Sequence, residues 1–268
     1  MVDKLKLYGF NNLTKTLSFN IYDICYTRTE SERSAYIEYI DEQYNSERLT
    51  NILKDVTHMI DASVLNIARQ DYDPIGASVT LLISEEQVSS KQVDPSCNLG
   101  EMPVKQSVVA HLDKSHVTVH TYPESHPDQN ISTFRVDIDV STCGKVSPIK
   151  ALDYLIQCFD SDVIIMDYKV RGFTRDIEGN KHYIDHSISS ILDYINPDIV
   201  KKYTTMDINL DHSNIFHTKM MLNQFILDNY IFNISASNLK TEEQTEIREK
   251  INREMAEIFY GMNIPLMK

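Results

Sequence analysis

The sequence contains no tryptophan, few glycines and only four cysteines among its 268 residues. The missing tryptophan and the scarcity of glycine exclude nothing by themselves. The cysteines are more informative, because Cys25, Cys97, Cys143 and Cys158 show no CxxC spacing, so the sequence predicts neither a zinc site nor a disulfide framework. Reduced thiols are typical of the cytosol, and we therefore expect a cytoplasmic protein.

Long apolar runs and positive charge are also in short supply. No run approaches the roughly 18 apolar residues of a membrane span, and Met1 to Phe10 lack the apolar core of a signal peptide. The 39 acidic residues outnumber the 26 lysines and arginines, which gives a net charge of −13. A nucleic-acid-binding protein needs a basic face. We therefore expect neither a nucleic-acid nor a membrane partner. The surplus of negative charge suits solubility and would also attract a cationic ligand.

Apolar residues at helical spacing predict several helices. Thr29 and Glu32 form a capping box, in which each side chain satisfies a backbone amide at the start of a helix. The apolar stripes lie over residues 36–44, 49–60, 149–159, 188–195 and 247–258. Ser147 and Pro148 are expected to cap and open the third of these helices, and Gly261 to end the last.

Five segments predict β-strands, namely residues 63–68, 77–83, 115–122, 134–140 and 163–170. The first two are joined by a predicted turn at 73–76. Pro123 is expected to close the third, because proline cannot donate a hydrogen bond to a ladder. The fourth alternates apolar and charged residues, which indicates a half-buried strand. Strands joined mostly by short turns, with helices grouped around them, predict an α+β fold with a largely antiparallel sheet.

A chain of 268 residues can form one large domain or two. Residues 84–106 turn polar and include Pro95, Gly100 and Pro103, so we expect a loop there. A weak candidate for a domain boundary lies near residues 172–179.

The segment 111–124 concentrates chemically useful side chains. It holds His111, His116 and His120, together with Ser115 and the carboxylates Asp113 and Glu124. A serine at the entrance of a strand, among histidines, indicates a nucleophile with partners for proton transfer. The same pattern also describes a polar strand edge with solvated histidines.

Two other readings use the same residues. Asp113, Ser115 and either His116 or His120 could form a hydrolase triad, but no GxSxG elbow precedes a helix here. His116 and His120 could bind a metal ion, yet a strand separates residues four apart by about 13 Å. No set of metal ligands can be chosen from the sequence.

Three motifs in order resemble the S-adenosylmethionine decarboxylase proenzymes. Lys114-Ser115-His116 followed by His120-Thr121-Tyr122-Pro123-Glu124 resembles the self-cleaving site of that family. Ser141-Thr142-Cys143-Gly144 with Pro148 is similar to its downstream cysteine motif, and Tyr72-Asp73-Pro74-Ile75-Gly76-Ala77-Ser78-Val79 to its upstream turn. The flanks, residues 1–59 and 171–268, resemble the longer bacterial form. One departure is Lys114, where many members have glutamate.

The resemblance implies an α/β sandwich of the S-adenosylmethionine decarboxylase type, one domain over residues 1–268, cut by its own Ser115. The hydroxyl of Ser115 attacks the carbonyl of Lys114, and loss of the Ser115 Cα proton then releases the upstream chain. The products are a β chain of residues 1–114 and an α chain of residues 115–268, the latter capped by a pyruvoyl group. The family assigns the base for this step to the position of His120, and a neutral imidazole suits the role.

The pyruvoyl carbonyl would form a Schiff base with S-adenosylmethionine and act as the electron sink for decarboxylation. The product would be the aminopropyl donor for spermidine synthesis. The family assigns the acid that protonates the product to the position of Cys143. The longer bacterial form also implies Mg²⁺ as an activator. A catalytically inactive regulatory homologue is a further alternative, against which the presence of Ser115, His120 and Cys143 argues.

His120 raises a geometrical question, because five residues of extended strand span roughly 16 Å and exceed the reach of its side chain toward Ser115. Either the chain bends sharply after Ser115, or a second copy supplies His120 across a symmetric interface. We therefore expect a homo-oligomer with its sites near the interface.

Overall fold

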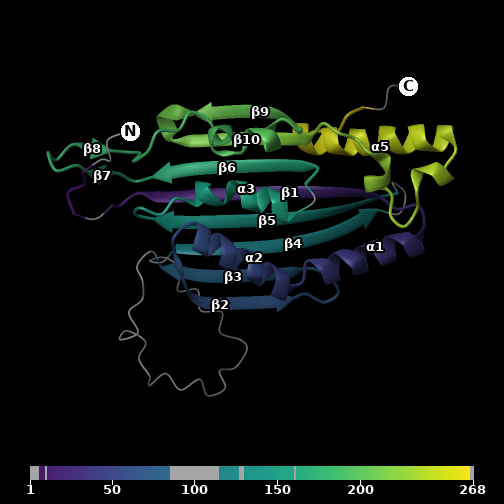
Figure 1. Cartoon of the computed structure of the whole chain (residues 1–268), viewed down its shortest axis with the longest axis horizontal. Coiled ribbons are helices and arrows are strands. Elements are labelled where there is room, and N and C mark those ends of the chain that lie inside the picture. The colour runs from purple at the N-terminus through teal and green to yellow at the C-terminus, as the bar shows by residue number, and fades with distance from the viewer. Residues whose placement is uncertain (1–5, 10, 85–114, 127–129, 160, 266–268) are drawn as a thin grey trace, which may run out of the picture.

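A computed structural model describes residues 6–9, 11–84, 115–126, 130–159 and 161–265. Within these residues, eight strands form one antiparallel sheet in the order β2-β3-β4-β5-β1-β6-β10-β9 (Figure 1). The strands are β1 (Thr14–Tyr26), β2 (Ser63–Asp71), β3 (Ala77–Ser84), β4 (Ser115–His126), β5 (Ile131–Cys143), β6 (Val163–Arg171), β9 (Tyr203–Leu210) and β10 (Ile215–Leu222). A small hairpin pairs β7 (Thr174–Arg175) with β8 (Lys181–His182). The predicted α+β class and antiparallel sheet are confirmed.

The main helices are α1 (Glu30–Gln43), α2 (Ser46–Met59), α3 (Leu152–Cys158), α4 (Pro197–Val200) and α5 (Thr241–Tyr260). The predicted capping box begins α1: the Thr29 hydroxyl accepts a hydrogen bond from the Glu32 amide, and the Glu32 carboxylate accepts one from the Thr29 amide. Gly261 ends α5 in the left-handed conformation, as predicted. Within the described residues, no helix is both long and apolar enough to cross a membrane.

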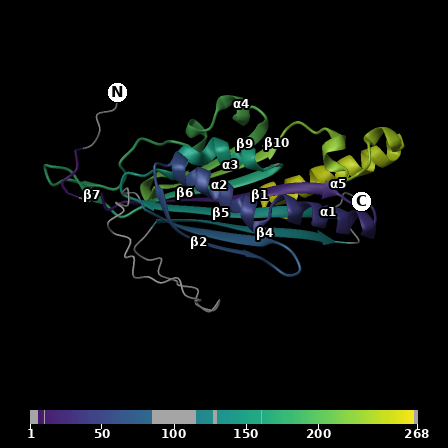
Figure 2. The same ribbon diagram turned by 60° about the horizontal axis from the view of Figure 1, so that its bottom comes forward.

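The two faces of the sheet differ. Figures 1 and 2 show α1, α2 and α3 lying along one face, where they pack on Leu17, Phe19 and Ile21 of β1 and on Val136 and Ile138 of β5. Intervening residues point to the opposite face. Near β10, α5 covers that face through Ile251 and Phe259, which pack with Val163 of β6. Its middle is polar and half exposed, and we call this area the polar face; it carries Ser18, Asn20, His120, Asp137 and Asp139.

Several sequence predictions need correction. The strand β4 continues through Pro123 to His126. Its pairing with β3 ends at His120, so Pro123 lies where β5 is the only neighbour of β4 among the described strands, and an edge position tolerates proline. Cys143 is the last residue of β5 and does not lie beyond it.

The helix expected after Ser147 begins with a 3₁₀ turn (η1, Pro148–Ala151), and the Ser147 hydroxyl makes no capping hydrogen bond. The helical stripe expected over 188–195 contains only a 3₁₀ turn (η2, Ile191–Tyr194). Ser190 caps this turn, and Pro197 begins the separate helix α4 three residues later. The loop expected at 84–106 lies, apart from Ser84, outside the described residues.

Strands from before and after the undescribed segment 85–114 alternate across the sheet. The strands β2, β3 and β1 precede that segment in the chain, whereas β4, β5, β6, β10 and β9 follow it. The strand β1 is inserted between β5 and β6, and β3 pairs with β4. The strands on either side of the possible boundary at 172–179, β6 and β10, are direct neighbours in this sheet.

Candidate active site

Ser115 and Cys143 meet where two neighbouring strands end. Ser115 is the first residue of β4, and Cys143 is the last residue of β5, which pairs with it. The Oγ of Ser115 lies 3.4 Å from the Sγ of Cys143 and accepts a hydrogen bond of 3.3 Å from the Cys143 amide. Ser115 is buried and Cys143 is half buried. A serine oxygen that touches both a thiol and a backbone donor is well placed for chemistry at that oxygen.

His120 does not join this pair within one chain. The register of β4 against β5 continues without a shift from His116 to His126, so the strand contains no sharp bend. The side chain of His120 stands on the polar face, and its Nδ1 lies 3.3 Å from the hydroxyl of Tyr72. Five residues of strand separate it from Ser115 by roughly 16 Å.

The three motifs of the sequence converge on adjacent strands. Ser78 of β3 is the register partner of His120, and His116 of β4 is the partner of Ser141. The upstream turn also packs against β4, because the Ala77 amide donates a hydrogen bond of 2.7 Å to the Thr121 hydroxyl. The pairing register of β3, β4 and β5, which cannot be read from the spacing of the motifs in the sequence, thus brings the three motifs together.

Other candidates take different places. Lys114, His111, Asp113 and Cys97 lie outside the described residues. His116 and His120 lie four positions apart on one straight strand, about 13 Å, which is too far to share a metal ion. Glu124 and His126 lie near the end of β4 remote from Ser115. Among the residues that the structure describes, no group of three or more His, Cys, Asp or Glu side chains could hold a metal ion.

Cys25 and Cys158 are remote from the Ser115–Cys143 contact. Burial, followed by the charges of Asp23 and Asp162, holds the pKa of the Cys25 thiol well above its ordinary value. Burial also raises the pKa of Cys158. Since thiolates are the reactive form of cysteine, both residues are poor nucleophiles.

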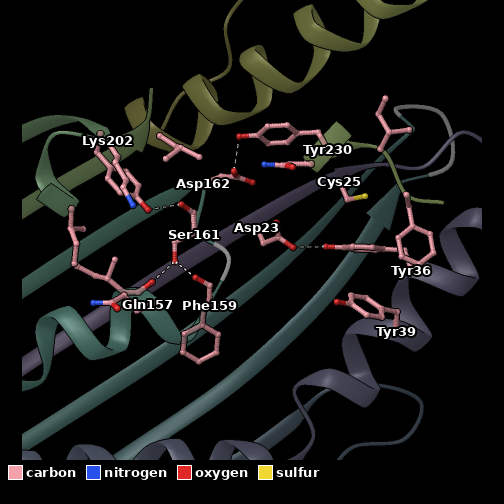
Figure 3. A pocket seen from close by; sticks show the side chains of 17 residues that line it. Asp23, Cys25, Tyr36, Tyr39, Gln157, Phe159, Ser161, Asp162, Lys202 and Tyr230 are labelled. Atoms are coloured by element: carbon pink, nitrogen blue, oxygen red, sulfur yellow. Dashed lines mark hydrogen bonds between the residues drawn. The ribbon is translucent and has the colours of Figure 1, made fainter. Parts of the chain in front are cut away.

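A cavity of about 590 Å³ opens at the opposite end of β1 from Cys143 (Figure 3). Its lining includes Asp23 and Asp162, each of which accepts a hydrogen bond from a tyrosine hydroxyl, that of Tyr36 and that of Tyr230 respectively. Thr14, at the near end of β1, is the register partner of Cys143, and Asp23 lies nine residues further along that strand. At about 3.3 Å per residue, this distance removes the cavity from the Ser115–Cys143 contact.

Sequence reasoning missed a group of polar residues behind the Cys143-Gly144 turn. Lys15 is almost fully buried and forms an ion pair of 2.7 Å with Asp185. The signal was present, because Lys15 shares the period-two alternation of Leu17, Phe19 and Ile21 and therefore faces the core. Asp185, 170 residues away in sequence, carries no comparable signal.

Comparisons with known proteins agree with the motifs. A family model described as S-adenosylmethionine decarboxylase matches residues 36–172. The chain is 63% identical to an S-adenosylmethionine decarboxylase proenzyme of Clostridium botulinum (strain Alaska E43), over 98% of this chain and 97% of that protein. It is 61% identical to the proenzyme of the same name from Halorhodospira halophila, over 99% and 98%.

Two solved structures are similar over part of the chain. The adenosylmethionine decarboxylase of Aquifex aeolicus has a TM-score of 0.32 and 16% sequence identity, covering 60% of this chain and 90% of that one. A Trypanosoma brucei adenosylmethionine decarboxylase monomer has a TM-score of 0.38 and 12% identity, covering 78% and 66%.

Proposed function

The chain belongs to the S-adenosylmethionine decarboxylase family, and from this premise we propose that Ser115, Cys143 and His120 carry out its self-cleavage and its reaction. The reaction is the pyruvoyl-dependent decarboxylation of S-adenosylmethionine, and the chain is a carboxy-lyase. The observation that carries the assignment of residues is the contact between the Ser115 hydroxyl and both the amide and the thiol of Cys143.

Self-cleavage begins with attack of the Ser115 Oγ on the carbonyl carbon of Lys114, which converts the amide into an ester. Removal of the Ser115 Cα proton then breaks the ester bond and releases residues 1–114 with a new carboxylate. Water adds to the dehydroalanine left at position 115, ammonia leaves, and a pyruvoyl group remains. The Cys143 amide supports this assignment, because it already donates to the attacking oxygen.

The residues around Ser115 suit a carbonyl group at its position. A backbone N–H and a thiol lie at the Ser115 oxygen, and both can donate a hydrogen bond to a keto oxygen. When present, the pyruvoyl group supplies the electrophile that takes up the electrons released with carbon dioxide. We assign the protonation of the substrate's former α-carbon to the Cys143 thiol, because its unperturbed pKa of about 8.5 keeps a thiol mostly protonated at pH 7.

We assign to His120 the removal of the Ser115 Cα proton, acting from a second copy of the chain. The separation along β4 argues against His120 reaching Ser115 of its own chain. Strand alternation puts Cys143 and His120 on the same face of the sheet, with Cys143 at the end of β5 and His120 in the middle of β4, and none of the described helices covers the centre of this polar face. A symmetric partner laid across that face could bring its own His120 to Ser115, so we propose a homo-oligomer.

We further propose that residues 1–268 remain one domain after the cut, because β3 and β4, on either side of it, are paired over six register positions. A cytoplasmic location is supported by Cys25, Cys143 and Cys158, none of which forms a disulfide in the described residues.

Mg²⁺ is proposed as an activator on the family resemblance alone. The described residues offer no acidic cluster for it, so we route no step through the ion. Loss of activity in a chelator, restored by added Mg²⁺, would support that proposal, and full activity in the chelator would exclude it.

Intact-mass measurement of the purified protein tests the assignment of Ser115. We expect fragments of 114 and 154 residues, the larger carrying a pyruvoyl group in place of Ser115. The Ser115→Ala variant should stay full length, because no hydroxyl remains to form the ester, whereas Ser125→Ala, further along the same strand, should cleave normally. A full-length wild-type chain with an unmodified Ser115 after days in solution would refute the proposal.

A further inference from the structure

A buried ion pair lies directly behind the Cys143-Gly144 turn. Lys15 of β1 is only 2% exposed and contacts Asp185, which is 14% exposed, at 2.7 Å. Burying a lysine destabilises a protein unless its partners are well placed, and an apolar pair of similar size often stabilises a protein as well or better. Stability alone is therefore a weak reason for this pair.

The ion pair lies at one backbone carbonyl group, that of Gly144. The oxygen of Gly144 accepts hydrogen bonds from Lys15 Nζ and from Asn11 Nδ2, both at 2.9 Å. The Oδ2 of Asp185 accepts from the same two nitrogens, at 2.7 and 2.8 Å. The Gly144 amide is held as well, because it donates to the Leu13 carbonyl at 3.1 Å. Both polar groups of Gly144 are thus fixed by residues that precede β1 or lie within it.

Asp185 is itself held from behind. Its Oδ1 lies 2.8 Å from His186 Nδ1, and His186 Nε2 lies 3.2 Å from the hydroxyl of the buried Tyr168. The carboxylate therefore has partners on both oxygens and little freedom to rotate. Lys15 and Asp185 lie on opposite sides of residues 36–172, the part of the chain that the family model matches.

We propose that Lys15 and Asp185 are positioning residues for Cys143: the ion pair fixes the Gly144 carbonyl and thereby holds the thiol of the adjacent Cys143 in place beside residue 115. This inference rests on the proposed function, because it gives the two flanks of the chain a role in the protonation step. A glycine at position 144, with φ of +67°, allows the turn but does not rigidify it, so the rigidity must come from its partners.

The protonation step has two outcomes, which makes positioning measurable. A proton delivered to the substrate's former α-carbon gives, after hydrolysis, the decarboxylated amine and a regenerated pyruvoyl group. A proton delivered to the pyruvoyl carbon gives, after hydrolysis, an aldehyde and an N-terminal alanine, and the enzyme is inactivated. Both routes consume one proton and one water molecule, so they differ only in which carbon atom receives the proton from the acid.

The test compares Lys15→Met and Asp185→Asn with Asp176→Asn as a matched control. Asp176 is also a carboxylate of the segment after β6, and it pairs with His182 and Asn180 without touching the Cys143-Gly144 turn. After self-cleavage, kcat of the two test variants should fall by about tenfold or more while KM changes little, because a displaced acid leaves substrate binding intact. Mass spectrometry of residues 115–268 should show several-fold more alanine-terminated chain per turnover. The control should match wild type in both.

A second readout needs no pyruvoyl group. In the uncleaved Ser115→Ala background, alkylation of Cys143 by iodoacetamide should be about threefold faster or more in Lys15→Met and Asp185→Asn, because the released turn exposes the thiol. Cys25 and Cys158, followed by peptide mapping in the same samples, should react at unchanged rates. Should Lys15→Met not fold, Asn11→Leu removes one of the two donors to Gly144 and leaves the ion pair in place.

The outcomes separate this inference from the assignment of Cys143. Variants that keep the wild-type kcat, alanine fraction and Cys143 alkylation rate would overturn the positioning role, and so would a rise in alkylation shared equally by all three cysteines. If Cys143→Ala, measured alongside, decarboxylates at the wild-type rate, the role of Cys143 itself is wrong. If Cys143→Ala is defective and the ion-pair variants are not, only the positioning role is wrong.

Discussion

The contact between Ser115 and Cys143 brings together the two residues to which we assign self-cleavage and the final protonation. In the proposed self-cleavage, the Ser115 oxygen that accepts a hydrogen bond from the Cys143 amide attacks the backbone and leaves with the new carboxylate of residues 1–114, while the carbon atoms of Ser115 become the group at which the substrate reacts. The thiol of Cys143 lies beside residue 115, where the proposed protonation takes place. We therefore propose that two residues at strand ends serve both the maturation of the enzyme and its turnover.

Replacing Cys143 by alanine should separate these two duties. We expect Cys143→Ala to fold and to self-cleave, because the amide that contacts Ser115 remains, but to turn over about 10²-fold more slowly for want of the acid. More of its chains should end in alanine at position 115. Cys158→Ala serves as the control, since Cys158 lies in α3. Rates from released carbon dioxide, combined with intact masses, test this, and a wild-type rate in Cys143→Ala would remove the thiol from the mechanism.

The stability contributed by Asp185 should depend on pH. Burial opposes its ionisation, but hydrogen bonds from His186, Lys15 and Asn11 and the Lys15 charge outweigh burial and hold the pKa well below its ordinary value. A carboxylate with a lowered folded-state pKa stabilises the fold above its unfolded pKa of about 3.9, and this stability is lost as the pH falls through the folded-state pKa.

We therefore expect Asp185→Asn, in the uncleaved Ser115→Ala background, to lower the free energy of unfolding by about 3 kcal/mol at pH 7, because it leaves Lys15 buried without its counter-charge. The difference from the parent should be the same at pH 5 and should shrink below about pH 4, where the unfolded parent takes up a proton that its folded form does not. Urea unfolding at pH 7, 5 and 3.5 measures it. A difference that stays constant over this range would contradict the argument.

At the scale of elements, the turn between β2 and β3 shows how a motif supports the site from a distance. Gly76 adopts a φ of +97°, and a Cβ there would lie 2.9 Å from the Thr121 carbonyl oxygen of β4. The same turn carries Tyr72, whose hydroxyl contacts His120. The motif thus requires glycine for close packing of the turn on the strand that holds His120.

Gly76→Ala should destabilise the fold more than Gly179→Ala does. Both glycines have positive φ, but a Cβ at Gly179 meets nothing within 4 Å, so only backbone strain of about 1 kcal/mol is expected there. At Gly76 the Thr121 backbone must also shift, and we expect a loss of about 2–4 kcal/mol. Urea unfolding of both variants in the Ser115→Ala background gives the comparison. Equal losses would show that the contact with Thr121 costs nothing.

Local signals predicted several elements from the sequence, but the clear alternation of one central strand was overlooked. The capping box and stripe of α1 and the alternation of residues 134–140 led directly to α1 and β5. The central strand β1 was missed, as were β9 and β10, although Leu17, Phe19 and Ile21 alternate clearly. Residues 188–195 have helical spacing, but a serine cap and Pro197 leave room for only one turn.

The site divides in the same way. Ser115, His120 and Cys143 were proposed from motifs, but only the register of β4 against β5 reveals that Ser115 and Cys143 touch and that His120 stands elsewhere. Lys15 looks like a surface residue by its type. The alternation of β1 places it on the core face, but its partner Asp185 lies 170 residues away, and no local pattern encodes such a partner.

At the scale of the whole molecule, the position of His120 makes a homo-oligomer testable. Co-expression of Ser115→Ala chains with His120→Ala chains creates mixed assemblies in which an intact Ser115 faces an intact His120 of the other copy. We expect fragments of 114 and 154 residues from the mixture, while each variant alone stays uncut. Size-exclusion chromatography with light scattering gives the oligomeric state. A mixture that yields no fragments, beside a wild type that cleaves, would mean that each chain supplies its own histidine.

The alternation of strands across the sheet has a consequence for the order of events in the life of the molecule. Strand β1 pairs with β5 and β6, and β3 pairs with β4. A cut before Ser115 therefore leaves two chains that pair with each other at three places in the sheet. Before the cut, folding is unimolecular. Afterwards the denatured halves must find each other, so recovery becomes bimolecular and slows with dilution. Self-cleavage therefore makes unfolding harder to reverse: the uncut chain can refold by itself, whereas the two chains of the cleaved enzyme, once unfolded, are no longer covalently linked.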